Sequence, residues 1–459
     1  MIDIDKARPI LEGIFDSHAA IKDLGPIAWG LVADADLAIS RDEHSVYRIA
    51  SMTKSFSCAA ILKLRDEGII RLDDPISVYA PELAHICGPT TDSPQITVRH
   101  LMTMSAGLAT DDAWADRHLD VADPTLDTWM SPGLLSAYAP GTAFEYSNLG
   151  FGLLGRVVLR ASGTRIQDVV SERLLKPLGM HQTSWTPPDG VKPGRRNDDA
   201  EATETLLGDG AIAPMGGIFT TVSDLAKWVA FMADAFPARN DVDDACLSRA
   251  SRREMQQVHR GFDPREFYGV DGRDRYVTGG YGFGLNVTHH DRLGWVVGHS
   301  GGLPGFGSNM RWVPSLGIGL VALANRTYAP MVEATSAALD ALVSNGVISR
   351  AIVPVSDAVT QCAALLVELH NSWTSETASE TFSDNVDSDL EYSKRAEVAG
   401  KTATEHGPFK LARIEADSAT SATVVAHGDG VELSIFFEVS PLKPPRVQRY
   451  ETTIMGADC

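Results

Sequence analysis

The spacing of apolar and polar positions changes along the chain and predicts the order of its elements. Residues 7–24 are predicted to form a helix, and the apolar run at 26–32 a buried strand. Helical segments and loops prevail between about residues 73 and 260. Short apolar strands separated by brief turns then fill residues 281–326, which predicts an antiparallel meander. A helix near residues 332–343 is expected to end it.

Two further helices have clear ends in the sequence. Small and apolar residues occupy positions 51 to 64 and lie on nearly every face of the predicted helix, so this helix should be buried. Gly68 lies just past its end. The second helix lies within residues 221–236, and we predict Ser223 as its N-cap.

The last quarter of the chain has a different pattern. The polar, acidic stretch 371–394 suggests a boundary or an exposed helical linker. We therefore predict a domain at 1–351 and a small α+β appendage at 352–459, to which we assign no chemistry. The fold class expected is α/β of the α+β type, with an antiparallel sheet flanked by helices and a mainly helical subdomain. Three strands are predicted in the appendage, at 407–416, 421–428 and 431–439.

Composition and charge narrow the possible partners. The chain has 459 residues, of which 44% are hydrophobic and 22% charged, as in globular proteins. Its formal charge of −20 disfavours nucleic acid and anionic membrane surfaces as partners. With no apolar leader and no long apolar span, we expect a soluble, cytoplasmic protein. The cysteines are scattered without a C-x-x-C pair, so we expect no disulfide framework, metal or cofactor: Cys58, Cys87, Cys246, Cys362 and Cys459.

Candidate chemistry begins with Ser51 and Lys54, in the sequence SMTK. Residues three apart share one face of a helix, so the two side chains should project together. Lys54 stands among small and apolar residues, and burial would lower its pKa until the neutral amine could take the proton of Ser51. Amides at the start of the helix would favour a developing oxyanion. The alternative is a capping serine and a lysine that reaches solvent.

Two other motifs occur downstream, YSN at 146–148 and HSGG at 299–302, the latter ending a predicted strand. With SMTK, and in this order, they make the chain resemble the serine β-lactamase and penicillin-binding-protein superfamily over roughly residues 25–340. The branch it resembles most comprises class C β-lactamases, D-alanyl-D-alanine carboxypeptidases, D-aminopeptidases and related esterases. The resemblance implies a β-lactamase-like transpeptidase fold.

The resemblance also implies a role for each motif residue. Ser51 would attack the carbonyl carbon, Lys54 and Tyr146 would handle its proton, and the backbone N–H groups of Ser51 and Gly302 would form the oxyanion hole. The residues implied to contact substrate are Asn148, His299, Ser300 and Gly301. Taken singly, each has a structural explanation: Tyr146 as a half-buried aromatic, Asn148 as a turn residue, and His299 as a core histidine.

A second serine competes for the role of nucleophile. Residues 298–302 fit G-x-S-x-G, the nucleophile elbow, which requires a strand, a sharp turn and a helix. The glycines and Pro304 that follow cannot begin a helix, so we reject the elbow and Ser300 as nucleophile.

His299 bears on the substrate, because the resemblance more often places a lysine there. A histidine is mostly uncharged at neutral pH but can still donate a hydrogen bond. We therefore expect a cytoplasmic serine hydrolase that cleaves an ester or amide of a small molecule or a short peptide through an acyl-enzyme at Ser51, with D-configured peptides among the candidates. The alternatives are a β-lactamase on the same site and a catalytically silent binding protein. The oligomeric state is left open by the sequence.

Overall fold

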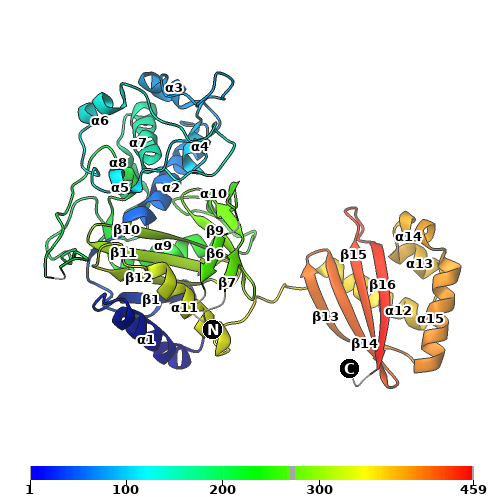
Figure 1. The fold of residues 1–459 in the computed structure, drawn as a ribbon. Coiled ribbons are helices and arrows are strands. Elements are labelled where there is room, and N and C mark those ends of the chain that lie inside the picture. The colour runs from blue at the N-terminus through cyan, green and yellow to red at the C-terminus, as the bar shows by residue number, and fades with distance from the viewer. Residues whose placement is uncertain (1, 200, 264, 269–273, 457–459) are drawn as a thin grey trace. The chain divides into compact units, whose positions relative to one another are not determined.

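The computed structural model describes residues 2–199, 201–263, 265–268 and 274–456. The chain divides into two compact units, Met1–Arg350 and Ala351–Cys459, and each is described separately (Figure 1). This division lies one residue from the domain boundary expected from the sequence.

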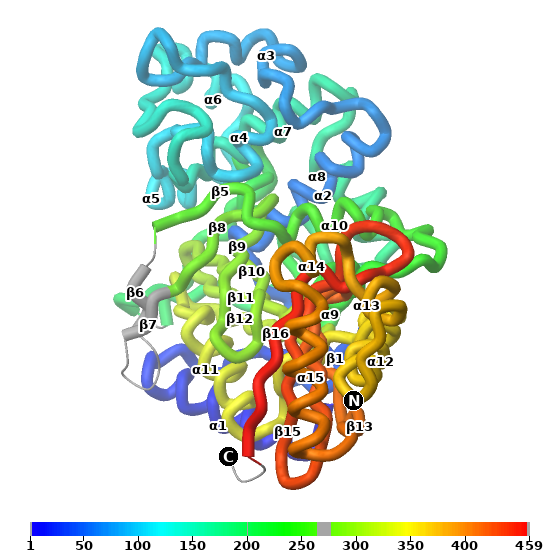
Figure 2. The backbone as a smooth tube through the Cα atoms, turned by 90° about the vertical axis from the view of Figure 1, so that its right-hand side faces the viewer, coloured from blue at the N-terminus to red at the C-terminus, as the bar shows by residue number. Residues whose placement is uncertain are grey.

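The first unit is built on an eight-stranded sheet in the order β2-β1-β12-β11-β10-β9-β8-β5, in which every neighbouring pair is antiparallel. The stretch from β9 to β12 confirms the predicted meander, and its order can be followed in Figure 2. The strands are β1 (Ala28–Ala33), β2 (Asp36–Arg41), β5 (Arg260–Gly261), β8 (Gly279–Tyr281), β9 (Asn286–His290), β10 (Gly294–Leu303), β11 (Phe306–Val313) and β12 (Ile318–Ala324). Two short pairs lie outside the sheet, β3 (Tyr47–Arg48) with β4 (Phe219–Thr220) and β6 (Arg265–Tyr268) with β7 (Asp274–Val277).

Helices cover both faces of this sheet. On one face, α1 (Ile4–Ile21) packs beside α11 (Met331–Ser344), and Phe15 of α1 stacks on Trp29 of β1. On the other face, α9 (Val222–Ala233) packs on β1 and β12. Its Trp228 stacks on Phe56 of α2 (Thr53–Asp66), with ring centroids 4.0 Å apart. The apolar surroundings predicted for α2 are confirmed, and Gly68 follows it in the left-handed conformation.

The predicted cap of α9 is wrong. Thr221 is the N-cap, because its backbone is extended and its side chain accepts a hydrogen bond from the N–H of Asp224 at 3.1 Å. Ser223 already lies within the first helical turn. A sequence with hydroxyl residues at both 221 and 223 does not fix which of them the backbone leaves outside the helix.

The middle part of the first unit's sequence forms a helical subdomain. In space this subdomain lies beyond one end of the sheet, with α2 running towards it (Figure 1). Its helices are α3 (Ile76–Tyr79), α4 (Val98–Met102), α5 (Asp112–Ala115), α6 (Asp123–Met130), α7 (Asn148–Ser162) and α8 (Ile166–Val170). The last of them continues into a π-helical turn, η3 (Ser171–Leu175). Short 3₁₀ turns are η1 (Ala50–Met52), η2 (Pro81–Leu83) and η4 (Ala213–Met215), and α10 (Arg249–Met255) precedes β5.

The second unit is a four-stranded antiparallel sheet with helices. The strands β13 (Lys410–Ser418), β14 (Ser421–Gly428), β15 (Val431–Val439) and β16 (Val447–Gly456) are neighbours in chain order, and α12 (Asp357–Asn371) packs on the first three. Its other helices are α13 (Ser375–Thr381), α14 (Asp384–Asp389) and α15 (Tyr392–His406).

Two expectations for this unit are wrong. The stretch 371–394 is not a linker, because α13 and α14 lie within it and bury Ala378, Phe382 and Val386 in the core. The sequence also predicted three strands where there are four. Of the residues in β16 only Val447 is buried, so this strand lacks the apolar alternation that marks the others.

Candidate active site

Ser51 lies in η1, the 3₁₀ turn that precedes α2. The residue before it, Ala50, is fully buried and has a φ of +50°, a left-handed conformation that non-glycine residues seldom adopt. Strand β10 lies against this turn at Gly301, where a Cβ atom would come within 2.1 Å of the carbonyl oxygen of Ile49. The absence of a side chain at Gly301 therefore lets the strand lie directly beside the turn that carries Ser51.

Lys54 is completely buried in the first turn of α2. Its Nζ donates to Ser51 Oγ at 2.9 Å, to Asn148 Oδ1 at 2.7 Å and to the carbonyl oxygen of Met215 at 2.9 Å. The three partners account for the three N–H bonds of an ammonium group. The i, i+3 spacing thus brings the amine to the hydroxyl, and the alternative of a solvent-reaching lysine does not describe this structure.

The charge on Lys54 is set by two opposing effects. Burial lowers its pKa to about 8, although the negative charges of Asp112, Asp116 and Asp111 act to raise it. At pH 7 about a tenth of the amine is therefore uncharged, and this neutral form is the one that can act as a general base for Ser51.

Tyr146 is half-buried just before α7. Its phenol lies near enough to Ser51 for the two side chains to interact, and the ammonium of Lys54 lies 4.9 Å from its ring centroid. Burial raises the pKa of Tyr146 above its ordinary value, so the phenol keeps its proton. Of the two candidate bases beside Ser51, Lys54 is therefore the one that loses its proton more readily, and Tyr146 can donate one.

Asn148 is the first residue of α7, and two carboxylates that the sequence did not point to hold it in place. Asp111 accepts from the N–H groups of Asn148 and Leu149, both at 2.7 Å, where the helix dipole also favours a negative charge. Asp112 accepts from Asn148 Nδ2 at 2.6 Å, which turns the amide oxygen towards Lys54. Both acids lie in the run DDAWAD, a polar stretch that gave no indication of what it would face.

Asp116 is the third carboxylate of this run. Asp116 is 5% exposed and accepts a hydrogen bond from Tyr328 Oη at 2.9 Å. Burial raises its pKa to about 7. A Cβ atom at Gly302 would lie 2.9 Å from the ring of Tyr328, so this tyrosine packs beside the proposed oxyanion-hole residue.

His299 is buried, and both of its ring nitrogens are bonded within the protein. Nδ1 lies 2.6 Å from the carbonyl oxygen of Ser300, and Nε2 lies 2.9 Å from Tyr281 Oη. Because a carbonyl only accepts, Nδ1 carries the proton and Nε2 accepts from the phenol. Burial, with a smaller contribution from Lys54, lowers its pKa to about 3. His299 is thus neutral, and in this structure its one N–H is bonded to the carbonyl oxygen of Ser300.

Ser300 and Gly302 follow on the same strand. β10 continues without a turn through Leu303 and then pairs with β11, so the strand–turn–helix of a nucleophile elbow is not formed at Ser300. Ser300 is exposed. The strand β9 pairs with β10 only over residues 294–298, and within the described part of the chain no strand continues that pairing. The edge of β10 that carries the predicted substrate contacts is therefore open on this side.

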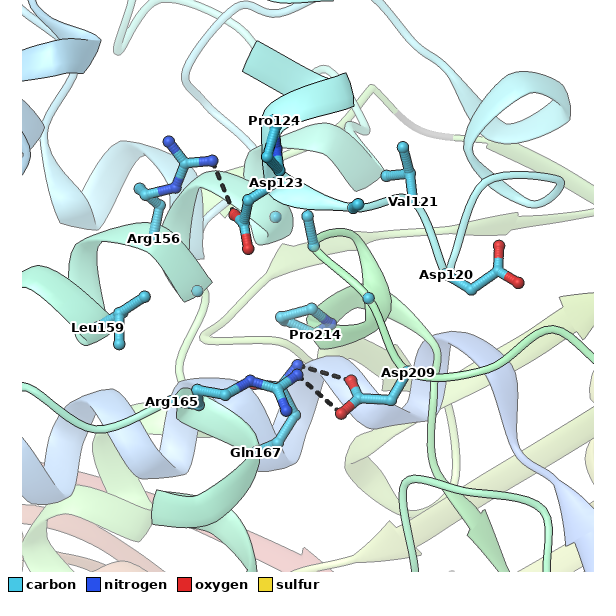
Figure 3. Close-up of a pocket in the computed structure, with 15 residues that line it drawn as sticks. Asp120, Val121, Asp123, Pro124, Arg156, Leu159, Arg165, Gln167, Asp209 and Pro214 are labelled. Atoms are coloured by element: carbon cyan, nitrogen blue, oxygen red, sulfur yellow. Dashed lines mark hydrogen bonds and ion pairs between the residues drawn. The ribbon is translucent and has the colours of Figure 1, made fainter.

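A cavity of about 420 Å³ lies in the helical subdomain, lined in part by Pro214, next to the residue whose carbonyl binds Lys54 (Figure 3). Four of its charged residues form two ion pairs: Arg165 with Asp209 at 2.7 Å and Arg156 with Asp123 at 2.8 Å. For metals, no group of three or more His, Cys, Asp or Glu side chains in the described ranges is placed to hold an ion. None of the described helices is both long enough and apolar enough to cross a bilayer.

Comparison with known proteins decides the family. The Beta-lactamase family model matches residues 17–344, well over half of the chain. The chain belongs to the Beta-lactamase family. This confirms the resemblance inferred from the three motifs, and the large antiparallel sheet flanked by helices confirms the fold class.

Curated relatives agree with this assignment. The chain is 30% identical over 294 residues to the D-alanyl-D-alanine-carboxypeptidase/endopeptidase AmpH of Escherichia coli strain K12, a match that spans 62% of this chain and 71% of the relative. It is 28% identical to Beta-lactamase-like protein 4 of Dictyostelium discoideum and 26% identical to Protein flp of Staphylococcus aureus strain N315. These two matches span 65% and 64% of this chain, and 53% and 55% of the relatives.

A solved structure shares the fold. The octameric penicillin-binding protein homologue from Pyrococcus abyssi superimposes with a TM-score of 0.59 at 20% identity, covering 98% of this chain and 90% of that one. Family membership and these relatives identify the chain as similar to serine hydrolases in general.

Proposed function

We propose that this protein is a serine hydrolase that cleaves an amide or ester bond of a small molecule or short D-configured peptide through an acyl-enzyme on Ser51. The observation that carries the proposal is the 2.9 Å separation between Ser51 Oγ and the buried amine of Lys54. A hydroxyl becomes a useful nucleophile only when a base within hydrogen-bond reach accepts its proton, and a buried amine with a lowered pKa is such a base.

The reaction would proceed in two stages. As Ser51 Oγ bonds to the carbonyl carbon, its proton passes to the neutral amine of Lys54, and the N–H groups of Ser51 and Gly302 bind the oxyanion. The bond to the leaving group then breaks, and Tyr146 donates the proton that the departing nitrogen or oxygen requires, regaining one from Lys54. Water then attacks the carbonyl carbon of the resulting ester while Lys54 takes a proton from it. The bond between that carbon and Ser51 Oγ breaks, Lys54 returns the proton to Oγ, and the carboxylic acid leaves.

The relatives support the choice of substrate class. One of them is a D-alanyl-D-alanine carboxypeptidase/endopeptidase, and we carry over from it the short D-peptide as the first substrate to test. A β-lactamase on the same site and a catalytically silent binding protein are the other outcomes that the experiment separates. The uncharged His299 disfavours a strong β-lactamase, because it offers no positive charge to a β-lactam carboxylate.

Intact-mass spectrometry tests the proposal. The protein is mixed with p-nitrophenyl esters, D-amino-acid amides, D-alanyl-D-alanine peptides and β-lactams, and the same panel is run on Ser51→Ala and on Ser300→Ala. We expect acyl adducts on the wild type and on Ser300→Ala, and none on Ser51→Ala. Adducts that persist in Ser51→Ala but vanish in Ser300→Ala would reverse the choice of nucleophile. No adduct on the wild type across the panel would favour the silent protein.

A further inference from the structure

One tyrosine joins the strand of the proposed oxyanion hole to the helical subdomain. Tyr328 follows β12, and a Cβ atom at Gly302 of β10 would lie 2.9 Å from its ring. Its phenol donates a hydrogen bond to Asp116 Oδ2 at 2.9 Å, and Asp116 is the C-cap of α5 in the helical subdomain. The side chain of Tyr328 therefore links the two parts of the first unit that supply the candidate site.

The backbone at Tyr328 has an unusual conformation. Its φ of +51° lies in the left-handed region, which non-glycine residues seldom adopt. The preceding residue anchors the segment, because the N–H of Thr327 donates to the carbonyl oxygen of Arg195 at 3.0 Å. A strained residue persists where its surroundings fix it, and such residues cluster at functional sites. Ala50, which precedes Ser51, is strained in the same way, so a left-handed residue lies beside each of the two proposed oxyanion donors.

The hydrogen bond between Tyr328 and Asp116 is buried at its acidic end. Asp116 is 5% exposed, and a buried carboxylate that loses a hydrogen-bond donor costs free energy. Tyr328 is 48% exposed. Burial and the negative charge of Asp116 raise the pKa of its phenol, so the phenol keeps the proton that it donates. Asp116 thus holds the phenol in one place, and the ring of Tyr328 with it.

Asp116 also acts on Lys54 through its charge, which is a separate effect. Three carboxylates and the thiol of Cys58 act to raise the pKa of Lys54 against the larger effect of burial, the carboxylates being those of Asp112, Asp116 and Asp111. Burial raises the pKa of Asp116 itself to about 7, so it is mostly charged near pH 8, where Lys54 titrates. An asparagine at this position would remove the charge but keep an oxygen that can accept from the phenol.

We propose that Tyr328 is a positioning residue of the oxyanion hole: its bond to Asp116 holds the ring against Gly302 and keeps the N–H of that residue aligned with the N–H of Ser51. The inference rests on the proposed function, in which these two N–H groups bind the oxyanion. β10 pairs with β11 as far as Leu303 but, among the described residues, with β9 only over 294–298. At Gly302 the strand is therefore held by hydrogen bonds from one side, and the ring of Tyr328 supplies a further restraint. Small displacements of an oxyanion donor are costly, because its contribution depends on short, preorganised hydrogen bonds.

Acylation by p-nitrophenyl acetate, followed by rapid mixing at the high-pH plateau of the rate, tests this. The p-nitrophenolate ion leaves without needing a proton, so the rate reports the attack of Ser51 and the binding of the oxyanion. Tyr328→Phe keeps the ring and removes the hydroxyl, and we expect the acylation rate constant to fall about tenfold while the dissociation constant of the ester changes less than about twofold. Asp116→Ala should lose as much, and the double variant no more than either, because all of them break the same bond. Tyr138→Phe alters another half-exposed tyrosine and is the control, which should acylate at the wild-type rate.

Asp116→Asn separates the hydrogen bond from the charge. Its plateau rate should equal that of the wild type, since the amide oxygen can still accept from Tyr328. The midpoint of its pH–rate profile should move below 8, because Lys54 loses one of the negative charges that raise its pKa. Tyr328→Phe should show the opposite pattern, with a lower plateau and a midpoint that stays near 8. A purely structural role would lower the Tm of Tyr328→Phe and leave its rate constant unchanged.

Three results would overturn the proposal: wild-type acylation in Tyr328→Phe, a loss confined to the dissociation constant, or single losses that multiply in the double variant. In each of them the wild type still acylates on Ser51, so the hydrolase stands and the role of Tyr328 falls. A wild type that reacts with no ester, or that reacts equally well as Ser51→Ala, would refute the proposed function itself, and this role with it.

Discussion

Replacing Lys54 by methionine removes a buried amine and keeps a side chain of similar length. Burial lowers the pKa of Lys54 from 10.5 to about 8, so the unfolded chain holds this proton more tightly than the folded one. Between these two pH values the unfolded state binds more protons, and the free energy of unfolding of the wild type must rise with pH. Below about pH 8 Lys54 is protonated in both the folded and the unfolded state, and burying its charge then lowers the free energy of unfolding by the full amount.

The two pKa values set the size of the effect. From pH 7 to pH 9.5, this one group should raise the free energy of unfolding by about 2 kcal/mol. Loss of the hydrogen bonds to Asn148 and Met215 changes the stability of Lys54→Met at every pH, but it contributes no pH dependence of its own. The wild type and the variant should therefore differ in how steeply the free energy of unfolding rises with pH. That difference measures the Lys54 amine separately from other groups that titrate in this range.

Urea unfolding at pH 7 and pH 9.5, followed by tryptophan fluorescence, measures this difference. Trp373 is the single tryptophan of the second unit among eight in the chain, so the signal reports mainly the unit that contains Lys54. The control is Lys63→Met, a partly exposed lysine on the same helix, which should keep the wild-type slope. Equal slopes in wild type and Lys54→Met would refute the reasoning, because they would mean that Lys54 is as well solvated as in the unfolded chain.

Three further outcomes follow from the site. The rate of acylation should rise with pH to a plateau with a midpoint near 8, the pKa of Lys54, and Lys54→Ala should lower it by orders of magnitude while circular dichroism stays unchanged. Titration of His299 should not change the rate between pH 5 and 8, since its pKa is about 3. If His299→Gln removed a titration step from the pH–rate profile in this range, the expectation would be wrong. Gly301→Ala places a Cβ atom 2.1 Å from the carbonyl oxygen of Ile49, so we expect acylation to fall at least about tenfold, with a lower Tm in differential scanning calorimetry. Wild-type acylation in Gly301→Ala would show that the turn does not need its contact with β10.

Local pattern was enough for much of the fold. The buried helix α2, the left-handed Gly68 after it and the meander from β9 to β12 are each encoded by neighbours in sequence, because side-chain periodicity is a local property. The strand β16 was not predicted for the same reason, because an edge strand with one buried residue has no alternation of apolar and polar residues.

For the candidate site, too, some features follow from local sequence and others depend on the tertiary structure. That Ser51 and Lys54 share a face follows from helix geometry alone, and three motifs in order were sufficient to identify the family. Only the tertiary structure decided what surrounds them: the carbonyl of Met215 on the amine, the carboxylate of Asp112 that turns Asn148, and the phenol of Tyr281 that occupies His299. These partners come from segments far apart in the chain, and their hydrogen bonds exist only once the sheet and the helical subdomain have closed on α2. The sequence determined which groups could react, and the fold decided how much of each group's charge and hydrogen-bonding capacity remains for a substrate.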